Sequence, residues 1–342
     1  MRIAVIGAGA WGTSLSIVLG RKGIHQIRLW AHEKQVAESI AATRINQAFL
    51  PGYVLPESVM CTNSLEVALE SAEIVVSVMP SHHCRQLFES VARLLTSESR
   101  IVSATKGLEQ GTLSRMTEVI QEVTARQCGF LPQVGALSGP SFAKEVARGD
   151  PTAITIAATD AKLTQVVQQE FSDPSFRVYT NDDVVGVELG GALKNIIAIA
   201  AGVCDGLGLG HNSVAALITR GLAEITRLVV ACGGRRETMA GLAGLGDLVL
   251  TCTGELSRNR SVGVELGRGK KLVEIIAGMH GMVAEGVLTT TAAVGLARKH
   301  GIEMPITDQM ELILQKGKPP RDAIYELMTR SGKSETSVMA GK

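Results

Sequence analysis

Short apolar runs alternate with longer amphipathic stretches through the first half of the chain. An apolar run of four to six residues predicts a buried strand, and apolar positions spaced three or four apart predict a helix. Strands are expected at 3–6, 27–30, 74–79, 101–105, 135–138 and 153–158, and helices at 13–22, 64–71 and 112–124. Strands that alternate with helices are typical of an open parallel sheet with helices on both faces.

A glycine-rich turn joins the first predicted strand to the first predicted helix. Gly7, Gly9 and Gly12 fit the pattern G-x-G-x-x-G in the strand–turn–helix context that a dinucleotide-binding turn requires. The first glycine permits a tight turn, the second lets the backbone approach a pyrophosphate, and the third lets the helix pack closely. Free N–H groups at the helix start attract phosphates. The motif predicts dinucleotide binding in a Rossmann-type domain, and a tight turn without a ligand is the alternative.

The end of the second predicted strand bears on the choice of cofactor. A NAD-binding fold usually places an acid there for the ribose 2′-hydroxyl, but this chain has His32. An imidazole does not repel a 2′-phosphate, which favours NADP or the use of both NADP and NAD. The alternative is that His32 is a surface residue without a ligand.

The pattern becomes helical after about residue 185. The run 187–204 is apolar on nearly every side, which is typical of a buried helix. The chain is therefore expected to have an α/β fold, with a Rossmann-type doubly wound sheet followed by an all-α domain. The predicted domains are a dinucleotide-binding domain at 1–185 and a helical substrate and catalytic domain at 186–330, with a polar tail at 331–342.

Lys194 is the main candidate for chemistry, because it stands in this apolar helix. A buried ammonium group is costly unless it is paired or faces a cleft. Asp247, the one acid in the apolar segment 239–250, is its expected partner. A lysine that extends its charge to the surface is the alternative. Arg258 stands between Ser257 and Asn259, which predicts a phosphate-binding group, with a solvated basic turn as the alternative.

Composition and charge remove several classes of function. Lys and Arg number 34 against 33 Asp and Glu, a net charge of +1, whereas a non-specific nucleic-acid binder normally has a basic excess. Six cysteines without a CxxC pair favour a reduced, cytoplasmic compartment. Glycines interrupt the first apolar run, so neither a membrane span nor an export signal is expected. His82 and His83 lack a third ligand at a metal-like spacing, so no metal is expected.

Seven motifs in this order resemble one family, the bacterial NAD(P)-dependent glycerol-3-phosphate dehydrogenases, from Ile3 to about Met328. The motifs lie at 7–12, 104–109, 138–143, 188–195, 244–247, 257–259 and 283–286. The resemblance implies interconversion of dihydroxyacetone phosphate and sn-glycerol 3-phosphate with NADPH or NADH, which supplies phospholipid synthesis. It also implies a phosphogluconate-dehydrogenase-like arrangement of the two domains and a homodimer.

The resemblance also implies roles for individual residues. The residue that matches the family's proton donor and acceptor is Lys194. The positions that match the substrate site are Lys106, Gly139, Ser141, Lys194, Asp247, Ser257, Arg258 and Asn259. The positions that match the cofactor site, with the glycines of the turn, are Gly7, Gly9, Trp11, Gly12, His32, Lys106, Ala143, Arg258, Val283 and Glu285.

Two other functions are compatible with a dinucleotide-binding turn. One is a 3-hydroxyacid dehydrogenase of the phosphogluconate-dehydrogenase type, but its Lys-x-x-x-Asn pair is missing, since Asn195 directly follows Lys194 and residue 198 is Ala. The other is a non-catalytic redox sensor, which would have no reason to keep Lys194, Asp247 and Arg258.

Overall fold

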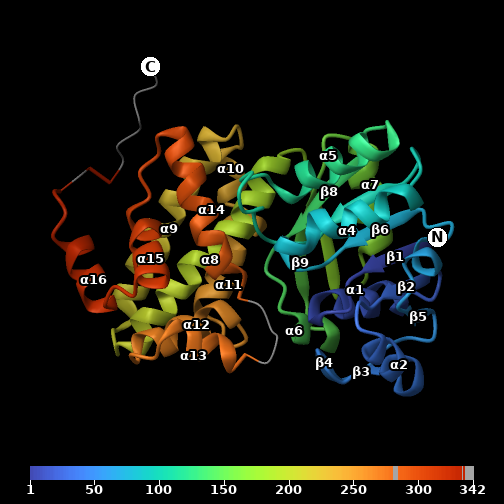
Figure 1. Ribbon diagram of the computed structural model, residues 1–342, viewed down its shortest axis with the longest axis horizontal. Coiled ribbons are helices and arrows are strands. Elements are labelled where there is room, and N and C mark those ends of the chain that lie inside the picture. Colours follow the sequence, from blue (N-terminus) through green and yellow to red (C-terminus); the bar gives the residue numbers. More distant parts are fainter. Residues whose placement is uncertain (280–283, 333, 336–342) are drawn as a thin grey trace.

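The computed structural model describes residues 1–279, 284–332 and 334–335. The predicted cofactor contact at Val283 and most of the predicted tail lie outside the described residues. Figure 1 shows a sheet-containing half, which carries the N-terminus, beside a half built from helices. The Rossmann-type sheet followed by a helical region agrees with the fold predicted from the sequence.

Within the described residues, eight strands form one sheet in the order β10-β9-β8-β7-β6-β1-β2-β5. Their bounds are β1 (Arg2–Ile6), β2 (Gln26–Trp30), β5 (Val59–Thr62), β6 (Ile74–Ser77), β7 (Arg100–Ser103), β8 (Gln133–Ser138), β9 (Thr152–Ala157) and β10 (Phe176–Asn181). A short hairpin, β3 (Ile45–Asn46) and β4 (Leu50–Val54), stands apart. Strands β3, β4, β5 and β10 are absent from the strands predicted above.

The expectation of a parallel sheet is wrong at one pair of strands. All neighbours pair in parallel except β8 and β9, which are antiparallel. A parallel connection needs a crossover that returns the chain to the opposite edge of the sheet. The helix between these strands, α6 (Ala143–Arg148), packs against α1 (Ala10–Arg21) instead. The chain therefore re-enters the sheet from the edge that it has just left.

Helices cover both faces of the sheet. On one face, buried side chains of α1, α2 (Lys34–Thr43), α6 and α7 (Ala161–Phe171) share a core with the strands. On the other, α3 (Leu65–Leu69), α4 (Cys84–Val91) and α5 (Met116–Cys128) form a second core, and the 3₁₀ turns η1 (Ser81–His83) and η2 (Ala92–Leu94) flank α4. Helix α1 begins three residues earlier than predicted, whereas α5 begins four residues later, after Leu113 adopts a left-handed conformation with φ 64°.

Helix α8 (Val184–Gly206) is the centre of the helical half, as its apolar sequence predicts. It is long and apolar enough to cross a membrane, but 89% of its most hydrophobic window is buried inside the protein. Helix α12 (Arg258–Gly267) packs against it with backbone in contact, because a Cβ at Gly202 would lie 2.0 Å from the Arg260 carbonyl. The remaining helices are α9 (His211–Ala231), α10 (Arg236–Met239), the π-helical turn η3 (Leu242–Gly246), α11 (Asp247–Thr253), α13 (Leu272–Ala277), α14 (Glu285–His300), α15 (Pro305–Lys316) and α16 (Pro320–Met328).

Candidate active site

The glycine turn has the shape that a dinucleotide requires. Gly7 has φ 121°, and a Cβ there would lie 1.8 Å from the Val78 carbonyl oxygen. A Cβ at Gly12 would lie 1.9 Å from the Gly7 carbonyl oxygen, so α1 packs directly against the turn. In contrast, a Cβ at Gly9 would have no described atom within 4 Å. The turn is therefore closed on its protein side and open at Gly9, where a pyrophosphate can approach the start of α1.

The strands beside the turn bring the other predicted cofactor contacts to the same edge. The Gly7 amide donates to the carbonyl of Trp30 at the end of β2, and the Val78 amide, after β6, donates to that of Ile6. His32 follows β2 and is exposed. The indole Nε1 of Trp11 is buried and has no hydrogen-bond partner within the described part of the chain. An unpaired buried donor in an otherwise open turn fits a site that accepts a polar ligand.

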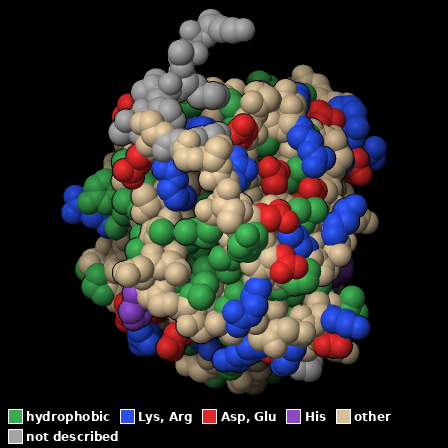
Figure 2. Space-filling view, turned by 90° about the vertical axis from the view of Figure 1, so that its left-hand side faces the viewer, with side chains coloured by type: hydrophobic (Ala, Val, Ile, Leu, Met, Phe, Trp, Pro, Cys, Tyr) green, Lys and Arg blue, Asp and Glu red, His purple; other side chains and the backbone are tan. Residues whose placement is uncertain are grey.

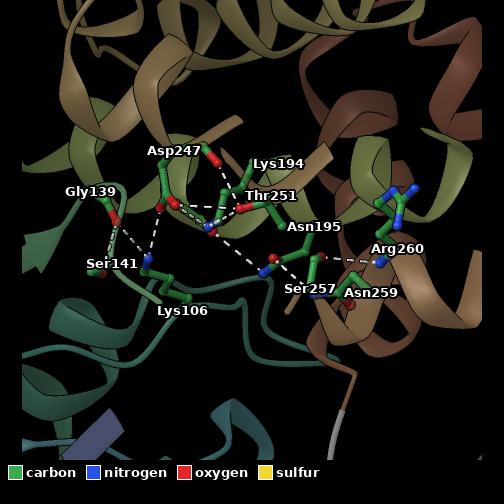
Figure 3. Close-up of polar contacts among 11 residues, drawn as sticks. Lys106, Gly139, Ser141, Lys194, Asn195, Asp247, Thr251, Ser257, Asn259 and Arg260 are labelled. Atoms are coloured by element: carbon green, nitrogen blue, oxygen red, sulfur yellow. Dashed lines mark hydrogen bonds and ion pairs between the residues drawn. The ribbon is translucent and has the colours of Figure 1, made fainter. Parts of the chain in front are cut away.

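Two lysines share one carboxylate where the sheet meets the helical half. Lys194 of α8 donates to Oδ1 of Asp247 and, over 2.7 Å, to the Thr251 hydroxyl, and both acceptors lie on α11. Lys106, in the loop after β7, donates to Oδ2 of Asp247 over 2.7 Å and to the Gly139 carbonyl over 3.2 Å. Figure 3 shows these groups converging. The cluster of Lys106, Lys194, Asp247 and Thr251 is called the lysine pair site below.

Burial changes the acidity of Lys194. Lys194 is 5% exposed, and desolvation lowers the pKa of its ammonium group to about 7. Asp247 opposes this shift, whereas the positive charge of Lys106 adds to it. A lysine with a pKa near neutrality exchanges a proton readily at neutral pH, as a general acid or base must. The side chain of Lys106 is 19% exposed and connects the cluster to the surface.

In the segment 257–260, three residues make contacts that hold the local structure, and the fourth, Arg258, is an unpaired cation among the described residues. The Ser257 hydroxyl accepts from the Arg260 amide and caps α12, and Asn259 bridges the side chain of Asn195 and the Gly286 amide over 3.0 and 2.9 Å. Arg260 pairs with Asp205 over 2.7 Å. Arg258 is exposed and makes no hydrogen bond or ion pair with any residue the structure describes, although Glu285 lies close enough to interact with it electrostatically.

The other predicted site residues lie in segments that follow β6 and β8 and at the start of α14. The Ser141 hydroxyl donates to the Gly139 carbonyl over 3.0 Å, and the Ala143 carbonyl accepts from Ser14 of α1 over 2.9 Å. Glu285 accepts from the Ser81 amide over 3.0 Å and from the Ser81 hydroxyl over 2.7 Å. Desolvation raises the pKa of Glu285, and these hydrogen bonds oppose the shift. Glu285 therefore joins the start of α14 to the segment after β6.

Comparison with known proteins identifies the family. A family profile described as the N-terminus of NAD-dependent glycerol-3-phosphate dehydrogenase matches residues 2–164, and the profile for the C-terminus matches residues 183–325. The chain belongs to the NAD-dependent glycerol-3-phosphate dehydrogenase family. This confirms the resemblance predicted from the motifs and favours it over the hydroxyacid dehydrogenase and sensor interpretations.

Relatives within the glycerol-3-phosphate dehydrogenase family match over nearly the whole chain. A Koribacter versatilis protein named glycerol-3-phosphate dehydrogenase (NAD(P)+) is 68% identical over 334 residues, which are 98% of each chain. One of the same name from Geobacter sulfurreducens is 53% identical, again over 98% of each. The crystal structure of glycerol-3-phosphate dehydrogenase from Coxiella burnetii is 42% identical, covers 96% of this chain and 99% of its own, and has a TM-score of 0.91.

The structure of the present chain shows two further residues beside the predicted site that were not predicted from the sequence. Thr251 accepts a hydrogen bond from Lys194, and Asn195 holds Asn259. Thr251 follows Asp247 by four residues, a spacing that places both side chains on one face of a helix, so this signal was present in the sequence. The contact between Asn195 and Asn259 has no such local signal.

Proposed function

We propose that this protein interconverts dihydroxyacetone phosphate and sn-glycerol 3-phosphate, using NADPH or NADH as the hydride donor. The observation that carries the proposal is the lysine pair site, whose Lys106 follows β7 at the same carboxyl edge of the sheet as the open glycine turn after β1, in a member of this family. The alternatives predicted from the sequence would need a different pair of catalytic side chains, or none.

The cofactor is assigned to the turn and the strand ends beside it. Gly7, Gly9 and Gly12 would hold the pyrophosphate, and His32 would face the adenosine ribose. The other proposed contacts are Trp11, Lys106, Ala143, Arg258, Val283 and Glu285. When bound, the nicotinamide supplies a hydride to the substrate carbonyl carbon.

Lys194 is proposed to donate the proton that the reduction requires. Negative charge grows on the carbonyl oxygen as the carbon is reduced, and a cationic acid beside that oxygen stabilises it and then gives up a proton. Asp247 holds the ammonium group from one side and Thr251 accepts from it on another, so its orientation is determined before the substrate arrives. In the reverse direction neutral Lys194 accepts the hydroxyl proton.

The substrate phosphate is assigned to the start of α12. A phosphate ester carries about −1.5 to −2 charges at pH 7, and arginine can bind it through two parallel hydrogen bonds. Arg258 is proposed as the clamp because its guanidinium has no hydrogen-bond partner in the described chain, whereas Arg260 is already paired. Ser257 and Asn259 would support the clamp, and Lys106, Gly139 and Ser141 would orient the rest of the molecule.

The setting of the enzyme is inferred from general features. Six free cysteines favour a reduced, cytoplasmic compartment, where the product would supply phospholipid synthesis. We also infer a division near residue 185 between the two domains.

We infer further that the protein is a homodimer. Figure 2 shows hydrophobic side chains gathered on the face at the helical end, and exposed apolar residues of this half include Val273, Tyr325 and Met328. Light scattering coupled to size exclusion would test the dimer.

A steady-state assay tests the activity. Dihydroxyacetone phosphate should cause loss of the absorbance of NADPH and NADH, and sn-glycerol 3-phosphate should cause the reverse change with the oxidised cofactors. Oxidation of a 3-hydroxyacid without any use of dihydroxyacetone phosphate would support the phosphogluconate-dehydrogenase type instead. Cofactor binding without turnover of either substrate would support a sensor.

A further inference from the structure

Three histidines surround the expected adenosine end of the glycine turn. The sheet order β6-β1-β2 places the turn after β1 between the carboxyl ends of β2 and β6. His32 is the second residue after β2, and His82 and His83 lie in η1, just after β6. All three are exposed. Two segments far apart in the sequence therefore present imidazoles on either side of one phosphate-binding turn.

His83 lies close enough to both of the other imidazoles to interact with them. The rings of His82 and His83 have centroids 3.9 Å apart, and His83 interacts electrostatically with both His82 and His32. Partial burial lowers the pKa of His82, and partial burial followed by the charges of His82 and His32 lowers that of His83. His82 and His83 therefore carry less positive charge at a given pH than ordinary imidazoles, and they gain charge as the solution becomes more acidic.

The charged groups around the three histidines do not cancel the gain of positive charge at lower pH. Glu285 at the start of α14 raises the pKa of His83, but its carboxylate is bound to Ser81. Glu33, next to His32, is an exposed residue before α2. Nearby charged residues of α5 and of the loop before it are already paired. Glu109 and Glu122 pair with Arg85 of α4, and Arg126 pairs with Glu89 of α4. Lys106 pairs with Asp247 in the lysine pair site.

We propose that His82 and His83 act with His32 as one cluster that recognises the 2′-phosphate of NADPH, so that preference for NADPH over NADH increases as the pH falls. NADH lacks this phosphate, and a hydroxyl group gains little from nearby imidazolium ions. The cluster therefore acts as a specificity determinant rather than as part of the proton transfer. The inference rests on the proposed position of the cofactor at the glycine turn.

Equilibrium binding of cofactor fragments tests the proposal without turnover. Calorimetry would compare adenosine 2′,5′-bisphosphate with adenosine 5′-monophosphate, which differ only in the 2′-phosphate. The ratio of their affinities should rise by up to about fivefold as the pH falls from about 8.5 to about 6, since the pKa values of His82 and His83 are lowered and an exposed ion pair contributes up to about 1 kcal/mol. The 2′-phosphate itself loses charge near pH 6. The affinity ratio of the wild-type protein at each pH is therefore compared with the ratio of a variant at the same pH.

A double variant, His82→Gln with His83→Gln, should flatten this rise while the monophosphate still binds. His300→Gln is the matched control, because His300 is exposed and ends the helix that Glu285 begins, about 22 Å from Glu285 along the helix at 1.5 Å per residue. It should keep the wild-type rise. In NMR titrations the pKa of His83 should increase on binding the bisphosphate but not the monophosphate.

Three results would count against the cluster or its location. A double variant with the wild-type rise would exclude His82 and His83 and leave His32 as the sole determinant. Loss of monophosphate binding in a folded double variant would assign the pair to the adenosine instead. If the folded wild-type protein bound neither fragment, the proposed cofactor position would be wrong, which is a failure of the proposed function rather than of the cluster alone.

Discussion

At the scale of single residues, the central feature is that two ammonium groups share one buried carboxylate. Asp247 is 1% exposed, and Lys194 and Lys106 bind its two oxygens. One negative charge cannot fully compensate two positive charges in a place with little water. The arrangement therefore favours release of one proton, and the more buried lysine is the one whose pKa is lowered.

Replacing Lys194 with alanine is expected to abolish turnover and leave cofactor binding intact. General acid catalysis contributes roughly 10²–10⁴-fold, and loss of charge stabilisation adds to this. The measurements are kcat with dihydroxyacetone phosphate and the dissociation constant of NADPH. Lys162→Ala, on the exposed start of α7, is the control and should retain full activity. A Lys194→Ala enzyme with more than about a tenth of normal activity would rule out the assignment.

The pH dependence should have opposite signs in the two directions. Protonated Lys194 is needed for reduction, so kcat/KM for dihydroxyacetone phosphate should be constant below about pH 7 and fall about tenfold per unit above it. Neutral Lys194 is needed for oxidation, so kcat/KM for sn-glycerol 3-phosphate should rise with pH and level off above the same value.

The positive charge of Lys106 provides a check on the cause of this pH dependence. It lowers the pKa of Lys194, so Lys106→Met should move the inflection in both profiles to higher pH. Profiles with the same sign in the two directions, or an inflection that Lys106→Met leaves in place, would mean that another group carries the proton.

Arg258→Ala should weaken use of the substrate mainly through the phosphate. A lost charge-assisted hydrogen bond costs about 1.5–3 kcal/mol, or some 10- to 150-fold in kcat/KM. Unphosphorylated dihydroxyacetone should be a poor substrate that loses little further rate in the variant, because remote binding energy normally positions the carbonyl group. Arg260→Ala, on the same helix, is the matched control. An equal loss with both substrates would assign Arg258 to the cofactor or to the local fold.

At the scale of elements, the glycines of the turn have two different functions: one allows the protein to pack, and another leaves space for a ligand. Gly12 is required by the protein itself, because a Cβ there would lie 1.9 Å from the Gly7 carbonyl oxygen, while a Cβ at Gly9 would meet no described atom within 4 Å. Gly9 has φ −70° and ψ −179°, an extended conformation that any residue adopts. Only a ligand gives a reason for glycine at that position.

This difference predicts opposite outcomes for two similar substitutions. Gly9→Ala should fold with a melting temperature close to wild type but bind NADPH and NADH at least about tenfold more weakly, since a methyl group there blocks the approach of the pyrophosphate. Gly12→Ala should lower the melting temperature, because its Cβ meets backbone at 1.9 Å. Calorimetry of unfolding and of binding would measure both. Normal cofactor affinity in Gly9→Ala would place the pyrophosphate elsewhere.

At the scale of the whole molecule, buried polar contacts join the sheet half to the helical half. They are Lys106 with Asp247, Ser81 with Glu285, and Arg115 with Glu188. Glu188 of α8 accepts from Arg115 over 2.7 Å and from the Thr117 amide over 2.9 Å. Arg115 precedes α5 and ends the loop that carries Lys106, so this contact also anchors one side of the lysine pair site.

Glu188→Ala should destabilise the protein by about 3–5 kcal/mol, because a largely buried guanidinium then loses its buried carboxylate and keeps the partly exposed one of Glu118. Glu118 contacts the same arginine but is 47% exposed, so Glu118→Ala should cost only about 1 kcal/mol. The measurement is the free energy of unfolding from urea titration. Equal losses for the two variants would show that burial of the Glu188 pair is not what couples the two halves.

Much of the fold followed from local patterns in the sequence. The turn at 7–12, the strands beside it and the buried helix α8 were all predictable, because periodicity and glycine spacing report whether a segment is buried and how tightly it turns. The cost of burying a lysine likewise led from Lys194 to Asp247 as its partner. These inferences need only the residue types and their neighbours along the chain.

Tertiary structure alone decided which distant groups meet. Lys106 and Asp247 are 141 residues apart, Asn195 and Asn259 are 64 apart, and neither contact has a periodic signal. The antiparallel pairing of β9 depended on where α6 packs, and the edge strands β5 and β10 depended on neighbours to pair with. Local patterns determine burial and conformation segment by segment, whereas partners depend on how the chain crosses over and closes, because side chains distant in sequence interact only after these crossovers form.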